Sequence, residues 1–198
     1  MTHQTAAPLV HINLSATYRR AEELTRTYTE HLGLDLDPPY QRGQVWIVDQ
    51  RRALVCSWLT GIPSGVVILA DRTNRAWLRS HGLTQHPDGA PMYAVIDGKQ
   101  RITTCQMWFA SEFAVPASWF NPDDIDVLED TDDGPYVRHN GLNLVGRRRL
   151  SAHALLQVAE AEPASLQDEA AIYLLVNGGG TPQSQADMDN AARIANPR

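Results

Sequence analysis

The chain has 198 residues, a length that suits one domain with at most a small appendage. Hydrophobic residues make up 43% of it and charged residues 20%, which is typical of a soluble globular protein. The net charge of −6 argues against a surface dominated by phosphate-binding charge, and no apolar run or signal peptide points to a membrane or to secretion, so we expect a cytoplasmic protein.

We expect residues 1–9 to form a flexible tail and residues 10–198 a single domain. The alternating residues 10–14 predict a short strand, and Ser15 then caps a helix over about 16–32. Gly33 ends this helix. Aromatic and aliphatic side chains recur along its expected buried side: Tyr18, Leu24, Tyr28 and Leu32.

A proline-rich loop follows and places Gln41 and Arg42 at a surface. We interpret Tyr40 and Trp46 as anchors whose side chains pack into the core. For Arg42, a binding role and an ordinary loop position stay equally open.

Three regular elements are expected between this loop and the middle of the chain. Asp49 caps a helix over 50–60, which Gly61 ends. Residues 66–70 form a continuous apolar run of strand length, and a short helix is expected near 75–80.

The stretch 93–103 carries the clearest local signal. Residues 93–96 predict a buried strand, which Asp97 and Gly98 break. Apolar residues from 102 to 113 then recur at helical spacing.

This arrangement crowds Lys99, Gln100 and Arg101 onto the first turn of a helix, directly after Asp97. Free backbone N–H groups and the positive end of the helix dipole favour an anion there, above all a phosphate. The alternative is that Asp97 merely caps the helix and that the basic side chains are solvated.

In the last third of the chain we expect strands at 125–128, 136–138 and 142–145, and helices at 152–161, 166–176 and 185–195. The fold class is therefore α+β, with a small mixed sheet built from strands near 66–70, 93–97 and 125–145 and flanked by helices. The glycine-rich segment 177–184 lets the backbone approach a ligand, or simply ends a helix.

Several other features carry less information. Cys56 and Cys105 lie on apolar helix faces and are interpreted as core thiols. His81 and His86 are weak candidates for a metal site, and the run Arg147–Arg149 is either a solvated strand end or a nucleic-acid contact.

Four motifs in order resemble the N-terminal domain of the GmrSD-type restriction endonucleases, within the broader ParB/sulfiredoxin-like group. The resemblance covers roughly residues 10–195, and the motifs that carry it are Pro39-Tyr40-Gln41-Arg42 with Trp46, Leu59-Thr60-Gly61-Ile62-Pro63, Asp97-Gly98-Lys99-Gln100-Arg101, and Asn177-Gly178-Gly179-Gly180-Thr181-Pro182-Gln183-Ser184. The third resembles the family's Asp-Gly-Gln-Gln-Arg signature of nucleotide hydrolysis, with Lys99 in place of the first Gln.

The resemblance implies a compact α+β domain that binds, and often hydrolyses, nucleoside triphosphates in the restriction of modified DNA. Asp97 would bind Mg²⁺ and, with Arg101, serve catalysis. The implied nucleotide-binding residues are Gln41, Arg42, Gly98, Lys99, Gln100, Thr103, Asn177, Gly179, Gly180 and Thr181.

The His-Asn-His nuclease domain usual in the family is not found in these 198 residues, so we do not expect this chain alone to cleave DNA. A non-catalytic DNA-binding or protein-interaction module, or a decoy, is the alternative, and a ParB-like nuclease is a second. DNA, a nuclease subunit and a second copy in a homodimer are the further partners left open.

Overall fold

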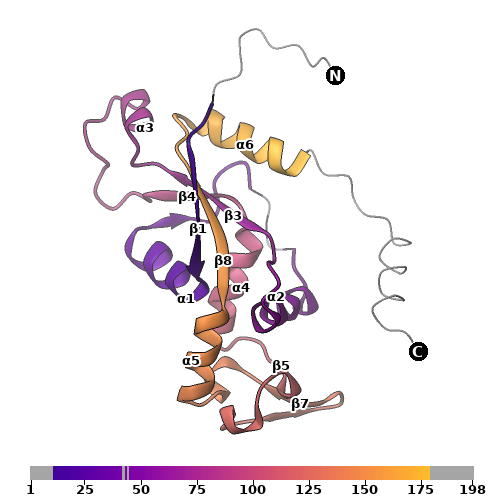
Figure 1. The fold of residues 1–198 in the computed structure, drawn as a ribbon. Helices are drawn as coiled ribbons and strands as arrows, with labels where there is room; N and C mark the ends of the chain where they lie inside the picture. Colours follow the sequence, from indigo (N-terminus) through magenta and orange to yellow (C-terminus); the bar gives the residue numbers. More distant parts are fainter. Residues whose placement is uncertain (1–10, 42, 44, 179–198) are drawn as a thin grey trace.

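The computed structural model describes residues 11–41, 43 and 45–178 (Figure 1). A five-stranded mixed sheet runs through it, in the order β1 (Leu14–Arg20), β8 (Leu155–Ala161), β3 (Val66–Asp71), β4 (Tyr93–Asp97), β2 (Leu34–Asp35). The pairs β1–β8 and β3–β4 are antiparallel, whereas β3–β8 and β2–β4 are parallel. The predicted α+β class with a small mixed sheet is confirmed.

Helices cover both faces of this sheet. Side chains of its central strands point alternately into two apolar clusters, one on each face. Val67, Leu69 and Val95 face the larger cluster. The helical segments on that side are α1 (Ala21–Glu23), the π-helical η1 (Leu24–His31), α2 (Val48–Thr60) and α4 (Lys99–Phe109). Ala70 and Ile96 face the smaller cluster, where α6 (Leu166–Gly178) packs through Ile172 and Tyr173.

A second sheet of three short strands lies at the end of the molecule opposite α6 (Figure 1). Its order is β5 (Val115–Pro116), β7 (Gly134–Val137), β6 (Glu129–Thr131). Three 3₁₀ turns and a helix accompany it: η2 (Ala117–Trp119), η3 (Pro122–Asp124), η4 (His139–Gly141) and α5 (Leu144–His153). The predicted contribution of residues 125–145 to the main sheet is therefore wrong, since this region forms a sheet of its own.

The predicted helix over 16–32 begins five residues late, because the strand before it is longer than expected. Ser15 does not cap the helix but lies within β1, which pairs with β8 from Leu14 to Arg20. Tyr18 is accordingly exposed on the strand, while Leu24 and Tyr28 are buried as predicted.

Two predicted elements between residues 142 and 161 are wrong: the expected strand leads into a helix, and most of the expected helix is a strand. Residues 142–145, expected as a strand, lead into α5, which Asn143 caps by accepting hydrogen bonds from the backbone N–H groups of Val145 and Gly146. Residues 155–161, expected as helix, form the central strand β8 between β1 and β3.

The remaining elements follow the sequence closely. The helix α2, the strands β3 and β4, the short α3 (Arg75–Ser80) and the helix α6 occur where predicted, although α4 ends at Phe109 and not at Phe113. Both cysteines are free thiols, with Cys105 fully buried and Cys56 partly exposed. The predicted tail 1–9 and helix 185–195 lie outside the described residues. Over the described ranges, every helix is too short or too polar to cross a bilayer.

Candidate functional site

The turn between β4 and α4 is built around Gly98, which is the N-cap of α4 and has a φ of 92°. A Cβ atom at this position would lie 2.9 Å from Cγ2 of Val67 on β3. The start of the helix can therefore approach the sheet only because residue 98 lacks a side chain. The alternative that Asp97 caps the helix is wrong, because no side chain caps α4.

We expect Gly98→Ala to destabilise the domain by about 2 kcal/mol or more, since an L-residue with positive φ costs about 1–2 kcal/mol before any clash with Val67. Urea unfolding of this variant beside Gly89→Ala, another positive-φ glycine with open space around it, separates backbone strain from the clash. Equal losses in the two variants would contradict the close-approach role.

A cavity of about 260 Å³ opens beside this turn. Residues from three separate stretches line it. They are Asp97, Gly98, Lys99, Gln100 and Arg101 at the start of α4, Gln41 and Trp46 from the preceding loop, and Tyr173 and Asn177 from α6. Seven of the positions singled out in the sequence thus share one cavity with two aromatic side chains.

Lys99 reaches the cavity from a buried position. Only 8% of its side chain is exposed, and its Nζ forms an ion pair with Oδ1 of Asp37, whose own side chain is 82% exposed. The ammonium group is therefore held at the edge of the protein interior by a carboxylate that solvent can reach. Another anion, such as a phosphate, could take the place of this carboxylate beside the ammonium group.

Arg101 is anchored to the backbone that leads into β3. Its Nε donates to the carbonyl oxygen of Ser64 at 2.7 Å, and its Nη1 to that of Val66 at 3.5 Å. A Cβ atom on Gly65 would lie 2.5 Å from its Nη2, so the guanidinium packs closely against this glycine. Its Nη1 also lies 3.8 Å from Oδ2 of Asp97. Both basic side chains are engaged, so the alternative that they are simply solvated is wrong.

Two glutamines tie the preceding loop to this turn. Gln41 donates through Nε2 to the carbonyl oxygens of Val95 and Ile96, at 3.0 and 2.6 Å. Gln100 accepts from the backbone N–H groups of Val45 and Trp46, both at 3.2 Å, and donates to the carbonyl oxygen of Gly43. These amides fix the loop as one wall of the cavity.

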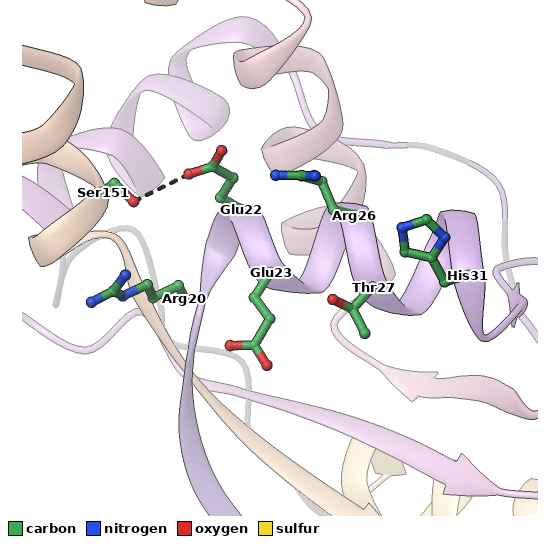
Figure 2. A pocket seen from close by; sticks show the side chains of 7 residues that line it. All are labelled: Arg20, Glu22, Glu23, Arg26, Thr27, His31 and Ser151. Carbon is green, nitrogen blue, oxygen red and sulfur yellow. Dashed lines mark hydrogen bonds between the residues drawn. The ribbon is translucent and has the colours of Figure 1, made fainter. Parts of the chain in front are cut away.

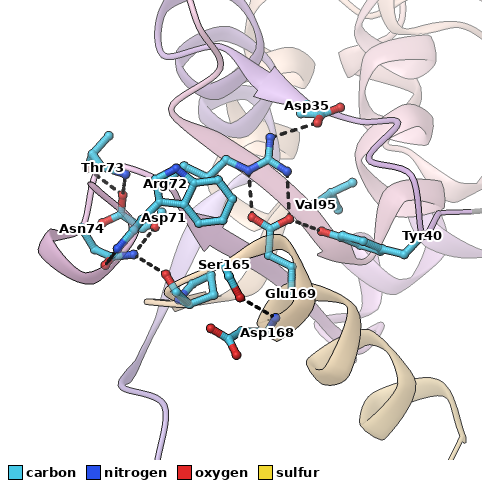
Figure 3. Close-up of polar contacts among 12 residues, drawn as sticks. Asp35, Tyr40, Asp71, Arg72, Thr73, Asn74, Val95, Ser165, Asp168 and Glu169 are labelled. Carbon is cyan, nitrogen blue, oxygen red and sulfur yellow. Dashed lines mark hydrogen bonds and ion pairs between the residues drawn. The ribbon is translucent and has the colours of Figure 1, made fainter. Parts of the chain in front are cut away.

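A buried charge network behind the cavity was not foreseen from the sequence (Figure 3). Glu169 near the start of α6 is fully buried and accepts two hydrogen bonds from Arg72, both at 2.8 Å. It also accepts one from the hydroxyl of Tyr40 at 2.8 Å, while Arg72 reaches Asp35 at 3.1 Å. Because Tyr40 precedes Gln41, this network joins α6 to the loop that lines the cavity.

The network shifts the pKa values of Tyr40 and Arg72. Burial, together with the neighbouring Glu169 carboxylate, raises the pKa of Tyr40 far above its ordinary value. Burial by itself would lower the pKa of Arg72, but the bonds to Glu169 and Asp35 outweigh that effect and raise it. Both groups therefore keep their protons throughout the physiological range.

Five predicted site residues are not among the described residues that line the cavity. Thr103 lies buried further along α4. Arg42, Gly179, Gly180 and Thr181 lie outside the described residues. Across the residues that are described, no three His, Cys, Asp or Glu side chains gather as a metal site, and this includes His81 and His86.

Another polar groove lies along α1 and η1, with a volume of about 430 Å³ (Figure 2). Charges of both signs line it: Arg20, Arg26 and His31 beside Glu22 and Glu23, with Thr27 and Ser151. The Oγ of Ser151 donates to Glu22 at 3.2 Å. The carboxylates offset the cations, so the charges of this groove do not favour an anion.

Comparison with known proteins assigns the chain to a family. Residues 22–192 match the model of the GmrSD restriction endonuclease, N-terminal domain. No curated protein and no solved structure matches the chain, so the ParB-like part of the fold assignment stays a prediction. The match covers most of the 198 residues and includes the cavity at the start of α4. The chain therefore belongs to the family of GmrSD restriction endonuclease N-terminal domains.

Proposed function

We propose that the cavity at the start of α4 binds a nucleoside triphosphate with Mg²⁺ and hydrolyses it slowly, as part of a system that restricts modified DNA. The observation that carries this proposal is the meeting of Lys99, Arg101 and Asp97 at a helix N-terminus, in one cavity walled by two aromatic side chains. The DNA-restriction context rests on the family match.

The phosphate chain would lie against the first turn of α4. Arg101 and Ile102 donate the first intrahelical bonds, to the carbonyl oxygen of Gly98, so the N–H group of Gln100 precedes the hydrogen-bonded ladder. This group and the Lys99 ammonium favour phosphate oxygens. Phosphoryl transfer requires mainly positioning and charge neutralisation, which this set of groups can supply.

Mg²⁺ fits the residues present only as a partner of the phosphates. It prefers octahedral oxygen ligands and is commonly held by one or two carboxylates together with substrate phosphates. Among the described residues that line the cavity, Asp97 is the one carboxylate, and its side chain is 29% exposed. Asp97 would hold the ion, which neutralises phosphate charge when it is bound.

The size of the cavity suggests how a nucleotide is placed. Its 260 Å³ is below the range of about 300–1,000 Å³ typical of pockets that enclose a small molecule. We therefore place the phosphates inside and the base towards Trp46, Tyr173 and Asn177 at the wall. Aromatic faces stack on bases of any identity.

A second function, a nucleotide-controlled interaction module without turnover, is favoured by one observation. Arg101, Gln41 and Gln100 already hold backbone groups of the surrounding loops. A bound phosphate that competes for these side chains would loosen those loops and change the surface that they form.

The two functions are separated by titrating each of the four ribonucleoside triphosphates with Mg²⁺ and by measuring phosphate release from any that bind. Binding with release supports the NTPase. Binding without release leaves the interaction module, and no binding at millimolar nucleotide rejects both.

The ion pair between Asp37 and Lys99 gives a further expectation. Asp37→Asn removes the carboxylate that competes with phosphate for Lys99, and nucleotide affinity should rise about two- to fivefold, on the scale of an ion pair whose carboxylate solvent can reach. Asp88→Asn removes one exposed charge from a loop that does not line the cavity, and it serves as the matched control. An equal gain in both variants would mean that net charge and not Asp37 sets the affinity.

A further inference from the structure

The end of the molecule that carries the second sheet has an apolar groove of about 530 Å³. The groove lies between η2, η3 and the start of β7, and its apolar lining includes Phe120, Ile125, Leu128 and Pro135. Because this end lies opposite α6 (Figure 1), the groove is separate from the proposed nucleotide site.

Exposed apolar side chains continue beyond the groove. Val127 is 61% exposed and Leu128 51%, and on the neighbouring segment Leu144 is 60% and Val145 50% exposed. The two segments are joined directly, because the Val127 N–H donates to the carbonyl oxygen of Gly141 at 3.1 Å. A small molecule in the groove would leave much of this apolar surface in water, whereas a polypeptide could cover it.

The segment that forms the groove is strongly acidic, and Asp126 lines the groove itself. Residues 117–135 contain no Lys or Arg but seven carboxylates: Asp123, Asp124, Asp126, Glu129, Asp130, Asp132 and Asp133. Arg149 pairs with Asp124, and Arg138 with Glu129. In the part of the chain that the structure describes, the other five have no cation within ion-pair distance.

We propose that this groove docks a basic amphipathic segment of a partner protein, with its apolar side chains in the groove and its Lys or Arg side chains against the acidic segment. Helix-in-groove recognition needs an apolar channel of this kind, and the charges of the acidic segment set the sign of the partner. Nucleic acid is disfavoured, because its phosphates would meet the five unpaired carboxylates. The inference does not depend on nucleotide binding.

The test uses a fluorescent synthetic peptide with Leu along one helical face and Lys elsewhere. Two control peptides carry Glu in place of Lys, or the same residues in scrambled order. Fluorescence anisotropy with the full chain should show that the amphipathic Lys peptide binds most tightly and weakens as salt is raised. Failure of that peptide to bind, or equal binding of the Glu peptide, would overturn the proposal.

Variants of the chain test whether the peptide binds in the groove. Leu128→Ser should weaken it about tenfold by removing apolar contact, and Asp126→Asn combined with Asp130→Asn should weaken it and flatten its salt dependence. Leu175→Ser, at a leucine that is 79% exposed on α6, should change nothing. Parent-like affinity in Leu128→Ser would overturn the proposal. The proposal would also be overturned if analytical sedimentation showed that the parent chain is a dimer and that Leu128→Ser dissociates it, because the groove would then dock a second copy.

Discussion

Arg72→Met is expected to destabilise the domain by about 3–5 kcal/mol, because it leaves a buried carboxylate without its charged partner. Glu169 is fully buried, and Arg72 supplies two of its hydrogen bonds. Denaturant unfolding followed by circular dichroism measures the loss. Arg75→Met, at an exposed position on α3, is the matched control and should change stability little.

A double-mutant cycle tests whether the pair acts as a unit. Glu169→Met alone should also destabilise strongly, whereas Arg72→Met combined with Glu169→Met should be no worse than either single change. Additive losses would mean that the two side chains contribute independently, and the network would then not be what holds α6 beside the cavity.

Asp97→Asn is expected to reduce phosphate release about 10²–10³-fold, because the Mg²⁺ that Asp97 would hold neutralises charge in the transition state, and losing one such electrostatic contribution commonly costs this much. Nucleotide affinity should fall much less, because Lys99 and the helix N-terminus remain. Lys99→Met should show the reverse balance, with binding weakened about tenfold or more through the loss of a charge-assisted hydrogen bond.

The results for both variants can be interpreted only if the site stays folded. This is checked by comparing their midpoints of thermal unfolding with that of the parent. Asp49→Asn on α2 removes a carboxylate that does not line the cavity and should leave phosphate release unchanged. Full release by Asp97→Asn with bound nucleotide would remove Asp97 from the chemistry.

The parts of the fold that could be predicted from the sequence are those with local signals. The β4–Gly98–α4 unit follows from a buried strand, a turn pair and helical spacing, all within about twenty residues. The strand β8 was missed because Leu, Gln, Ala and Glu are good helix formers, and only its pairing with β1 and β3 makes Leu155–Ala161 a strand.

The charge partners in the candidate site could not be predicted for the same reason. Lys99 and Asp37 are 62 positions apart in the chain, and Arg72 and Glu169 are 97 apart. The sequence gives no indication that an acid at the start of α6 is buried, since Asp168 and Glu169 are ordinary first-turn residues that complement the helix dipole. Only the folded chain shows that one of them is buried against Arg72.

The central claim is that the phosphates lie at the start of α4, and hydrogen–deuterium exchange tests it most directly. The full chain is compared with and without a nucleoside triphosphate and Mg²⁺. We expect the largest slowing of exchange in the peptide that covers residues 97–103, because its first-turn N–H groups would bond to phosphate. Saturable binding with unchanged exchange in that peptide, and protection elsewhere, would contradict the account.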